Sequence, residues 1–147
     1  MKHHLLTYLK SHFDTRLQMI NEALQAAQSA ANEETKSSAG DKYETARAMA
    51  QIERDRHAQL YEQIAQERAI LERINPSTGF QRVGLGALVR STAGIFFVAV
   101  SAGAVPMGDI EVIVVSPQSP LGTSLMGKQV GERFMFRQNE NIIKQIE

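Results

Sequence analysis

Glycine and proline are distributed unevenly along this chain, and their distribution limits the folds that it can adopt. Residues 1–75 contain one glycine and no proline, whereas residues 76–147 contain nine of the ten glycines and all four prolines. Because both residues destabilise helix interiors, only the first part can form long uninterrupted helices. We therefore predict a helical domain at residues 1–75 and a separate domain at residues 79–147.

Apolar residues in the first part recur at intervals of three and four, which places them on one face of a helix. They form two sets separated by the SSAG segment at residues 37–40. The first set is Leu5, Leu9, Phe13, Leu17, Ile20, Leu24, Ala27 and Ala31, and the second, less regular set is Met49, Ile52, Leu60, Ile64, Leu71 and Ile74. Two such helices with a short connection predict an antiparallel coiled-coil hairpin. Arms of about 33 residues would each be roughly 50 Å long.

The second part has the composition of a small sheet domain. Short β-branched or aromatic stretches bounded by glycine, proline and serine predict strands within 80–91, 94–103, 109–117, 133–138 and 141–146. A short helix is predicted after Ser119 as N-cap, with Pro120 at its first position and Gly127 just past its end. Alternation along strands predicts that one member of each pair, Phe96 with Phe97 and Phe134 with Phe136, points inward. The predicted class is α+β, a helical hairpin followed by a small antiparallel sheet.

Charge and composition exclude several functions. Sixteen basic and sixteen acidic residues cancel, which disfavours binding to free DNA through phosphate neutralisation. The chain has no cysteine, so thiol catalysis and disulfides are excluded, and a reducing, cytoplasmic location is expected. The N-terminal residues 1–14 contain too few consecutive apolar residues for a signal peptide or membrane span, and no contact with a membrane is expected.

Two acids, Asp41 and Glu44, directly follow the single glycine of the first part. The spacing is typical of a helix cap, in which an N-cap acid and a glutamate three residues later accept free backbone N–H groups. The same spacing makes both carboxylates project together from the end of a long hairpin. Two carboxylates do not complete a magnesium site, because Mg²⁺ takes six ligands, but they suit a half-site completed by another molecule. The two roles are compatible.

Two segments carry a resemblance to a known family. The stretch GDKYETA at residues 40–46 and the stretch SPLGTSLMGKQVGE at residues 119–132 resemble motifs of the bacterial Gre transcript-cleavage factors, and the likeness in the order of parts covers nearly the whole chain. The positions that match are Gly40, Asp41, Glu44, Ala46, Ser119, Pro120, Leu125, Gly127, Lys128 and Gly131, with Glu132 in place of the family's aspartate.

The resemblance implies a fold, a partner and a mechanism. In such factors the coiled coil enters the secondary channel of RNA polymerase, and an FKBP-like C-terminal domain docks at the channel mouth. Asp41 and Glu44 would then help the polymerase hold its second Mg²⁺ and orient a water that hydrolyses the 3′ end of backtracked RNA. The resemblance further implies partner-binding roles for Ser119, Pro120, Gly127 and Lys128, no cofactor of the protein's own, and no enzymatic activity without the polymerase.

Departures from the family pattern leave alternatives open. Lys42, Tyr43, Thr45 and Arg47 differ from the family's residues, and the positive charges could either compete for the acids or strengthen contact with RNA. One alternative is therefore a polymerase modulator that occupies the channel without supporting cleavage. Another is an FKBP-like peptidyl-prolyl isomerase or chaperone, against which the absence of Trp and Tyr after residue 75 argues. The third is a structural coiled-coil adaptor.

Overall fold

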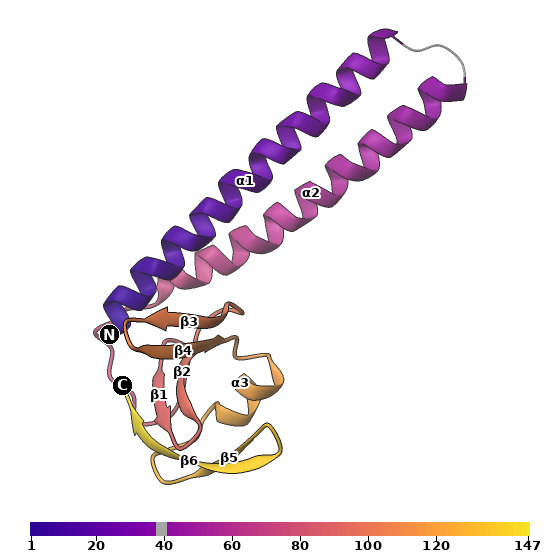
Figure 1. Cartoon of the computed structure of the whole chain (residues 1–147). Helices are drawn as coiled ribbons and strands as arrows, with labels where there is room; N and C mark the ends of the chain where they lie inside the picture. The colour runs from indigo at the N-terminus through magenta and orange to yellow at the C-terminus, as the bar shows by residue number, and fades with distance from the viewer. Residues whose placement is uncertain (38–40) are drawn as a thin grey trace. The chain divides into compact units, whose positions relative to one another are not determined.

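The computed structural model describes residues 1–37 and 41–147, and the side chains of residues 34–43 lie outside the described part. Two long helices, α1 (Lys2–Ser37) and α2 (Asp41–Arg73), precede all strands (Figure 1). The remaining elements are β1 (Leu88–Ser91), β2 (Gly94–Val98), β3 (Gly103–Met107), β4 (Ile110–Val115), α3 (Pro120–Leu125), β5 (Arg133–Phe136) and β6 (Asn139–Ile146). The predicted α+β class is confirmed. Within the described residues, no helix has the length and apolar character needed to cross a membrane.

The described chain forms two compact units. One unit comprises residues 11–69, the larger part of both long helices, and the other comprises residues 1–10 together with residues 70–147. The predicted boundaries at residues 75 and 79 stay a prediction.

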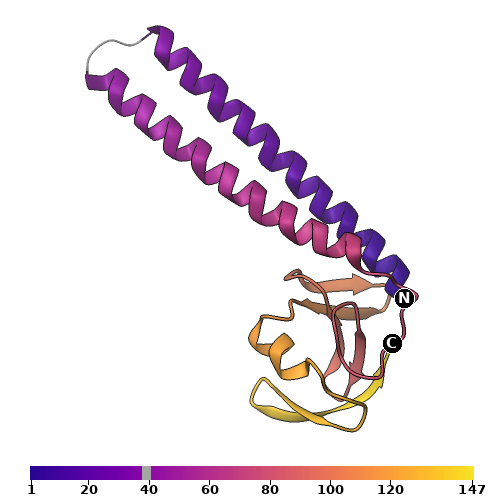
Figure 2. The ribbon, with the colours of Figure 1, turned by 180° about the vertical axis from the view of Figure 1, so that it is seen from behind.

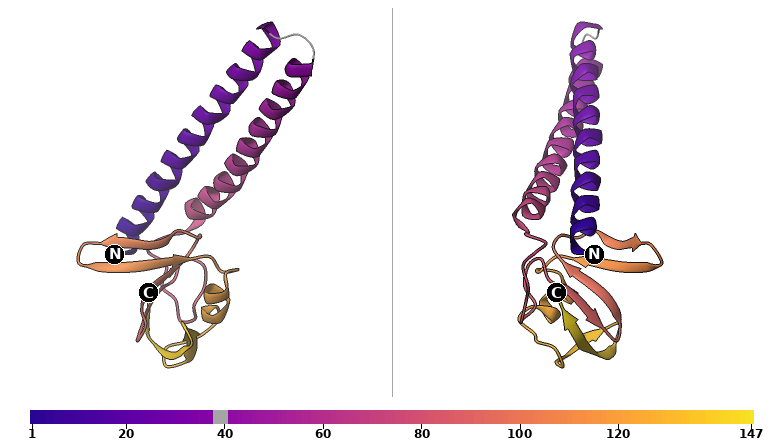
Figure 3. Two further views of the ribbon diagram at one scale, coloured as in Figure 1. Left: turned by 45° about the vertical axis from the view of Figure 1, so that its right-hand side comes forward. Right: turned by 90° about the vertical axis from the view of Figure 1, so that its left-hand side faces the viewer.

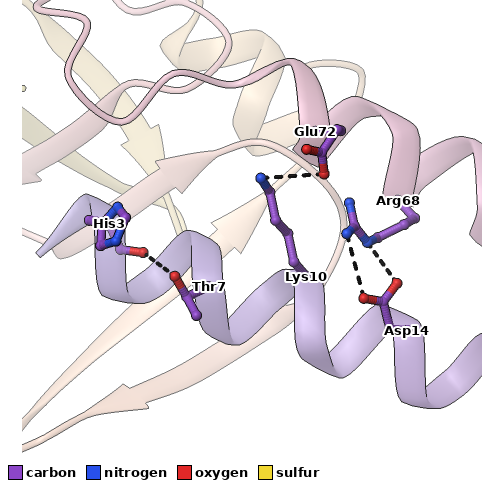
Figure 4. Close-up of polar contacts among 6 residues, drawn as sticks. All are labelled: His3, Thr7, Lys10, Asp14, Arg68 and Glu72. Atoms are coloured by element: carbon purple, nitrogen blue, oxygen red, sulfur yellow. Dashed lines mark hydrogen bonds and ion pairs between the residues drawn. The ribbon is translucent and has the colours of Figure 1, made fainter.

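Within residues 11–69, α1 and α2 run side by side in opposite directions, as the two views of Figure 3 show. Arg68 of α2 forms an ion pair with Asp14 of α1, with Nε 2.8 Å from Oδ1 (Figure 4). Farther along both helices, Arg54 Nη1 donates to Gln28 Oε1 at 3.4 Å. Phe13 is fully buried. These cross-helix contacts confirm the predicted antiparallel hairpin.

Only some residues of the predicted apolar seam are buried. Six of its members are buried, namely Leu5, Leu9, Phe13, Ile64, Leu71 and Ile74. The prediction is wrong for Met49, Ile52 and Leu60, which are 64%, 67% and 40% exposed. The reason is geometric: Arg54, which contacts α1, lies two residues from Ile52, or about 200° around the helix. The face that carries Met49 and Ile52 is therefore turned away from the contact with α1.

The sheet has the strand order β3-β4-β2-β1-β6-β5 and is antiparallel except for one pair (Figure 2). β2 and β4 are parallel, with Ile95 opposite Val112 and Val98 opposite Val115. β6, the last strand in the chain, lies between β1 and β5, and Leu88 and Glu147 exchange two backbone hydrogen bonds of 2.9 Å. β3 was not predicted. It contains Pro106 and lies at the edge of the sheet, where a strand tolerates a residue without an N–H group.

Phenylalanines form the centre of the sheet domain. The Phe96 ring meets the rings of Phe134 and Phe136 edge to face, with centroids 5.9 and 5.2 Å away. Residues two apart on a strand share a face, so both β5 rings reach Phe96. Phe97, on the opposite face of β2, is also fully buried. The prediction that one ring of each pair points inward is therefore wrong: both faces of β2 are covered, and Phe134 and Phe136 share one face of β5.

Candidate functional site

The two acids identified from the sequence lie in the first turn of α2. The helix begins at Asp41, and Glu44 follows three residues later with an exposed side chain. Residues three apart lie on the same side of a helix. The start of a helix also carries a partial positive charge, which stabilises carboxylates there. The side chain of Asp41 lies outside the described part, so its capping role stays a prediction.

Two carboxylates at this position can act as partial ligands for a hard cation. Among the described residues, no group of three or more His, Cys, Asp or Glu side chains is placed to hold a metal ion. Mg²⁺ requires about six oxygen ligands in octahedral geometry. A role for Asp41 and Glu44 as ligands to a metal that a partner molecule also holds stays a prediction.

A polar cavity of about 300 Å³ lies between the two arms close to this turn. It is lined by Gln28, Ala31, Asn32, Arg47, Gln51 and Arg54. Gln28 accepts from Arg54 and donates to Asn32 Oδ1 at 3.2 Å. The amides of this cavity were not predicted as functional. A signal was available in the sequence: Gln28 and Asn32 are four residues apart, and Gln51 and Arg54 are three apart, so each pair lies on one face of its helix.

The start of α3 is built as the sequence predicts. Ser119 is its N-cap, with Oγ accepting from Gly122 N at 3.0 Å and donating to Ser116 O at 2.7 Å. Pro120 is the first helical residue. These contacts give Ser119 and Pro120 a structural role in starting the helix.

Gly127 and Lys128 hold the segment after α3 in place. Gly127 has a φ of 77°, in the left-handed region that favours glycine, and its N–H donates to Val83 O at 2.8 Å. The Lys128 side chain is half-buried and its Nζ donates to the carbonyl oxygen of Arg133. The roles of these four residues in partner binding stay predictions.

One concave site on the sheet domain includes Lys128. This cavity of about 300 Å³ is lined by Thr123, Ser124, Lys128, Arg133, Phe134, Met135 and Glu140. Arg133 and Glu140 form an ion pair of 3.3 Å at its edge. Phe134 is the single aromatic residue in this lining. The lining therefore lacks the several aromatic side chains that the isomerase alternative predicts.

A buried charge lies at the beginning of α1. Lys2 is 6% exposed, its Nζ donates to Thr78 O at 2.8 Å, and the same atom lies 4.8 Å from the centre of the Phe80 ring. Burial lowers the pKa of the Lys2 amine from its ordinary value, and the charge of Glu147 partly opposes this shift. The carbonyl and the ring provide the contacts that this desolvated cation requires.

Together these elements define a protein that combines a long helical hairpin with a small, mostly antiparallel sheet domain. No family model matches the chain, and no curated protein matches it. Among solved structures, it is similar to GreA factor homolog 1 (Gfh1) of Thermus thermophilus, with 21% sequence identity, 94% of each chain covered and a TM-score of 0.38.

Proposed function

We propose that the protein binds RNA polymerase, inserts the end of its hairpin into the secondary channel and supports Mg²⁺-dependent cleavage of backtracked RNA. One observation carries the proposal: Asp41 begins α2 and the exposed Glu44 follows on the same side of its first turn. A helix of 33 residues is roughly 50 Å long. Such an arm can carry two acids into a deep channel while its base stays outside.

The sequence motifs support the same partner. Residues 40–46 and 119–132 resemble the two motifs of Gre factors, and they lie at the start of α2 and around α3. The first would act at the polymerase active centre. The second, with Ser119, Pro120, Gly127 and Lys128, would dock outside the channel.

The chemistry requires both molecules. In two-metal hydrolysis of a phosphodiester, one ion stabilises the attacking oxygen and the other the leaving oxygen. Asp41 would serve as a ligand, and Glu44 as a second ligand or as the group that positions the attacking water. Because two carboxylates leave most of the coordination shell to other donors, the protein would stimulate the polymerase's own nuclease activity and would not catalyse cleavage alone.

One observation favours a second candidate function. Arg47 lines the polar cavity near the first turn of α2 and lies three residues after Glu44 on the same side of the helix, which places positive charge close to Glu44. A basic side chain near the acids lowers the effective negative charge that they offer to a cation. On this basis the protein would occupy the channel and modulate the polymerase without supporting cleavage.

The test is RNA cleavage by a stalled, backtracked transcription complex from the same organism. We expect wild-type protein to stimulate cleavage, and the Asp41→Asn, Glu44→Gln double variant to bind equally well without stimulation. The matched control is Asp55→Asn with Glu62→Gln, which removes two exposed acids of the same helix and should leave cleavage unchanged. Helicity by circular dichroism verifies that all three proteins are folded.

Binding and cleavage together separate the candidates. Polymerase binding by wild type without stimulated cleavage would support the modulator and reject the cleavage role. Absence of binding would reject both and leave Asp41 and Glu44 as a helix cap. Lys128→Ala should weaken polymerase binding by roughly tenfold if the domain docks through the site at α3, since an interfacial charge contact contributes on the order of 1.4 kcal/mol.

A further inference from the structure

The middle of α2 exposes a group of large apolar side chains on one face. Met49, Ile52 and Leu60 are 64%, 67% and 40% exposed. Together with Glu53 and Arg56, they follow the spacing i, i+3, i+4, i+7 and i+11, which keeps all five residues on one side of the helix. The stripe formed by these five residues is called the outer face of α2 here.

Among the described residues, the hydrogen bond of Arg54 to Gln28 and the ion pair of Arg68 with Asp14, which join the two arms, do not involve the outer face. Arg54 comes one residue after Glu53, or about 100° around the helix, and two residues before Arg56, or about 200° in the reverse direction. A partner could therefore lie against the outer face without displacing α1.

Charge and apolar residues on this face are arranged symmetrically about the point between Arg54 and Asp55. Leu60 lies as far beyond that point as Met49 lies before it, and Arg56 lies as far beyond it as Glu53 lies before it. If a second α2 is laid antiparallel on this midpoint, Met49 faces Leu60 and Glu53 faces Arg56. Met49 thus meets an apolar residue, and Glu53, which also lies 3.2 Å from His57 Nε2 on its own helix, meets the opposite charge of Arg56.

We propose that the outer face is a self-association surface, on which a second copy of this chain docks through its own α2 in antiparallel orientation. The dyad would repeat each contact, giving two Met49–Leu60 contacts and two Glu53–Arg56 ion pairs, as in any isologous interface. Ile52 would pack beside the aliphatic stem of the partner's Arg56. An unrelated apolar partner would not require this mirrored order of charges, which is why the second copy is favoured as the occupant.

The surface predicts a reversible dimer. Three apolar side chains per copy form a small interface, below the roughly 1,200 Å² that stable complexes bury. The charges at its centre fix the register and orientation more than they add affinity. Dimer formation should therefore depend on protein concentration and weaken as salt increases. This inference does not rest on the proposed role at RNA polymerase.

Disulfide trapping tests the register directly, because the chain has no cysteine of its own. Met49→Cys and Leu60→Cys variants are prepared separately and mixed under mild oxidation. In the proposed dimer, residue 49 faces residue 60, whereas the two copies of residue 49 are about 16 Å apart along the axis. A disulfide needs Cα atoms within about 7 Å. We expect the mixed disulfide to form at least tenfold faster than either homodimeric disulfide.

Charge reversal tests the ion pairs. Glu53→Arg and Arg56→Glu each place like charges opposite one another twice per dimer, and each should weaken dimerisation at least tenfold in sedimentation equilibrium. The double variant Glu53→Arg, Arg56→Glu restores opposite charges and should return the dissociation constant to within about threefold of wild type. Glu62→Arg, an equal charge change on another face of α2, is the matched control and should have little effect.

Several results would overturn the proposal. Wild-type protein that sediments as a monomer at every concentration would do so, as would a dimer that both single charge variants leave intact. Equal rates for the mixed and homodimeric disulfides would indicate random collision and reject the register. Far-ultraviolet circular dichroism on each variant confirms that α2 remains helical, so that lost association is not mistaken for unfolding.

Discussion

Arg68 of α2 holds both carboxylate oxygens of Asp14 on α1, with Nε 2.8 Å from Oδ1 and Nη2 3.5 Å from Oδ2. The Arg68 side chain is 23% exposed and that of Asp14 is 58% exposed, so solvent screens part of the attraction. We expect Arg68→Ala to lower the free energy of unfolding by about 0.5 to 1 kcal/mol. A double-mutant cycle with Asp14→Ala in urea denaturation measures the coupling, and complete additivity would contradict a pair that acts across the helices.

Gly122 in α3 is required by a close approach of the backbone. A Cβ atom at this position would lie 1.8 Å from the carbonyl oxygen of Ser116. Gly122→Ala must therefore displace that segment and weaken the Ser119 cap, at an expected cost of about 3 kcal/mol. Thermal unfolding measures this cost. Gly79→Ala is the control, because a Cβ at residue 79 meets no heavy atom within 4 Å; equal melting temperatures for the two variants would refute the explanation.

Two isoleucines of the α2 seam should respond differently when each side chain is shortened to alanine. Ile64 is 2% exposed and Ile52 is 67% exposed. We expect Ile64→Ala to cost about 3 kcal/mol of stability through lost burial and a residual cavity. Ile52→Ala should change the stability of the monomer by less than about 0.5 kcal/mol. Denaturant titrations at low protein concentration, where self-association is absent, compare the two variants; similar losses would mean that Ile52 is covered by α1.

Lys2 should make stability depend on alkaline pH. Its folded-state pKa is lowered from the ordinary value of 10.5 because the amine is desolvated. Between the lowered pKa and 10.5, the unfolded chain binds more protons than the folded chain, so stability rises with pH through this window. Lys2→Met removes the titrating amine and should flatten the rise. Urea midpoints measured as the pH approaches 10.5 provide the comparison, and an unchanged slope in the variant would contradict the assignment.

The helix boundaries were largely predictable because the signals are local. Gly40 marks the break before α2, and Ser119, Pro120 and Gly127 mark the ends of α3, as the structure confirms for α3. Periodicity also placed Ile64 and Leu71 of α2, and Ile74 just after it, correctly in buried positions. It did not indicate which part of the seam faces α1, since that depends on contacts between two helices distant in sequence. Met49, Ile52 and Leu60 are exposed for this reason.

Strand order was less predictable than strand existence. Pro106 obscured β3, because a proline within a short apolar run argues against a strand unless the strand is at an edge. The parallel pairing of β2 with β4 follows from the passage of the chain through β3, and such long-range pairing leaves no local pattern. At the candidate site, Asp41 and Glu44 lie at the start of α2, where their position after Gly40 indicates a helix start, and their role at a metal stays a prediction. The amides of the polar cavity were missed because they come from both arms.

The position of β6 has a consequence for the order in which the parts of the protein fold during synthesis. β6 lies between β1 and β5, and its residues come last in the sheet domain. Helices depend on local contacts and form quickly, whereas pairing between distant strands waits for both partners. The helical hairpin can therefore fold on the ribosome while β1 still lacks its neighbour β6 and has an unpaired edge. Until residues 139–147 emerge, that edge is available to other nascent chains, and the final strand closes it.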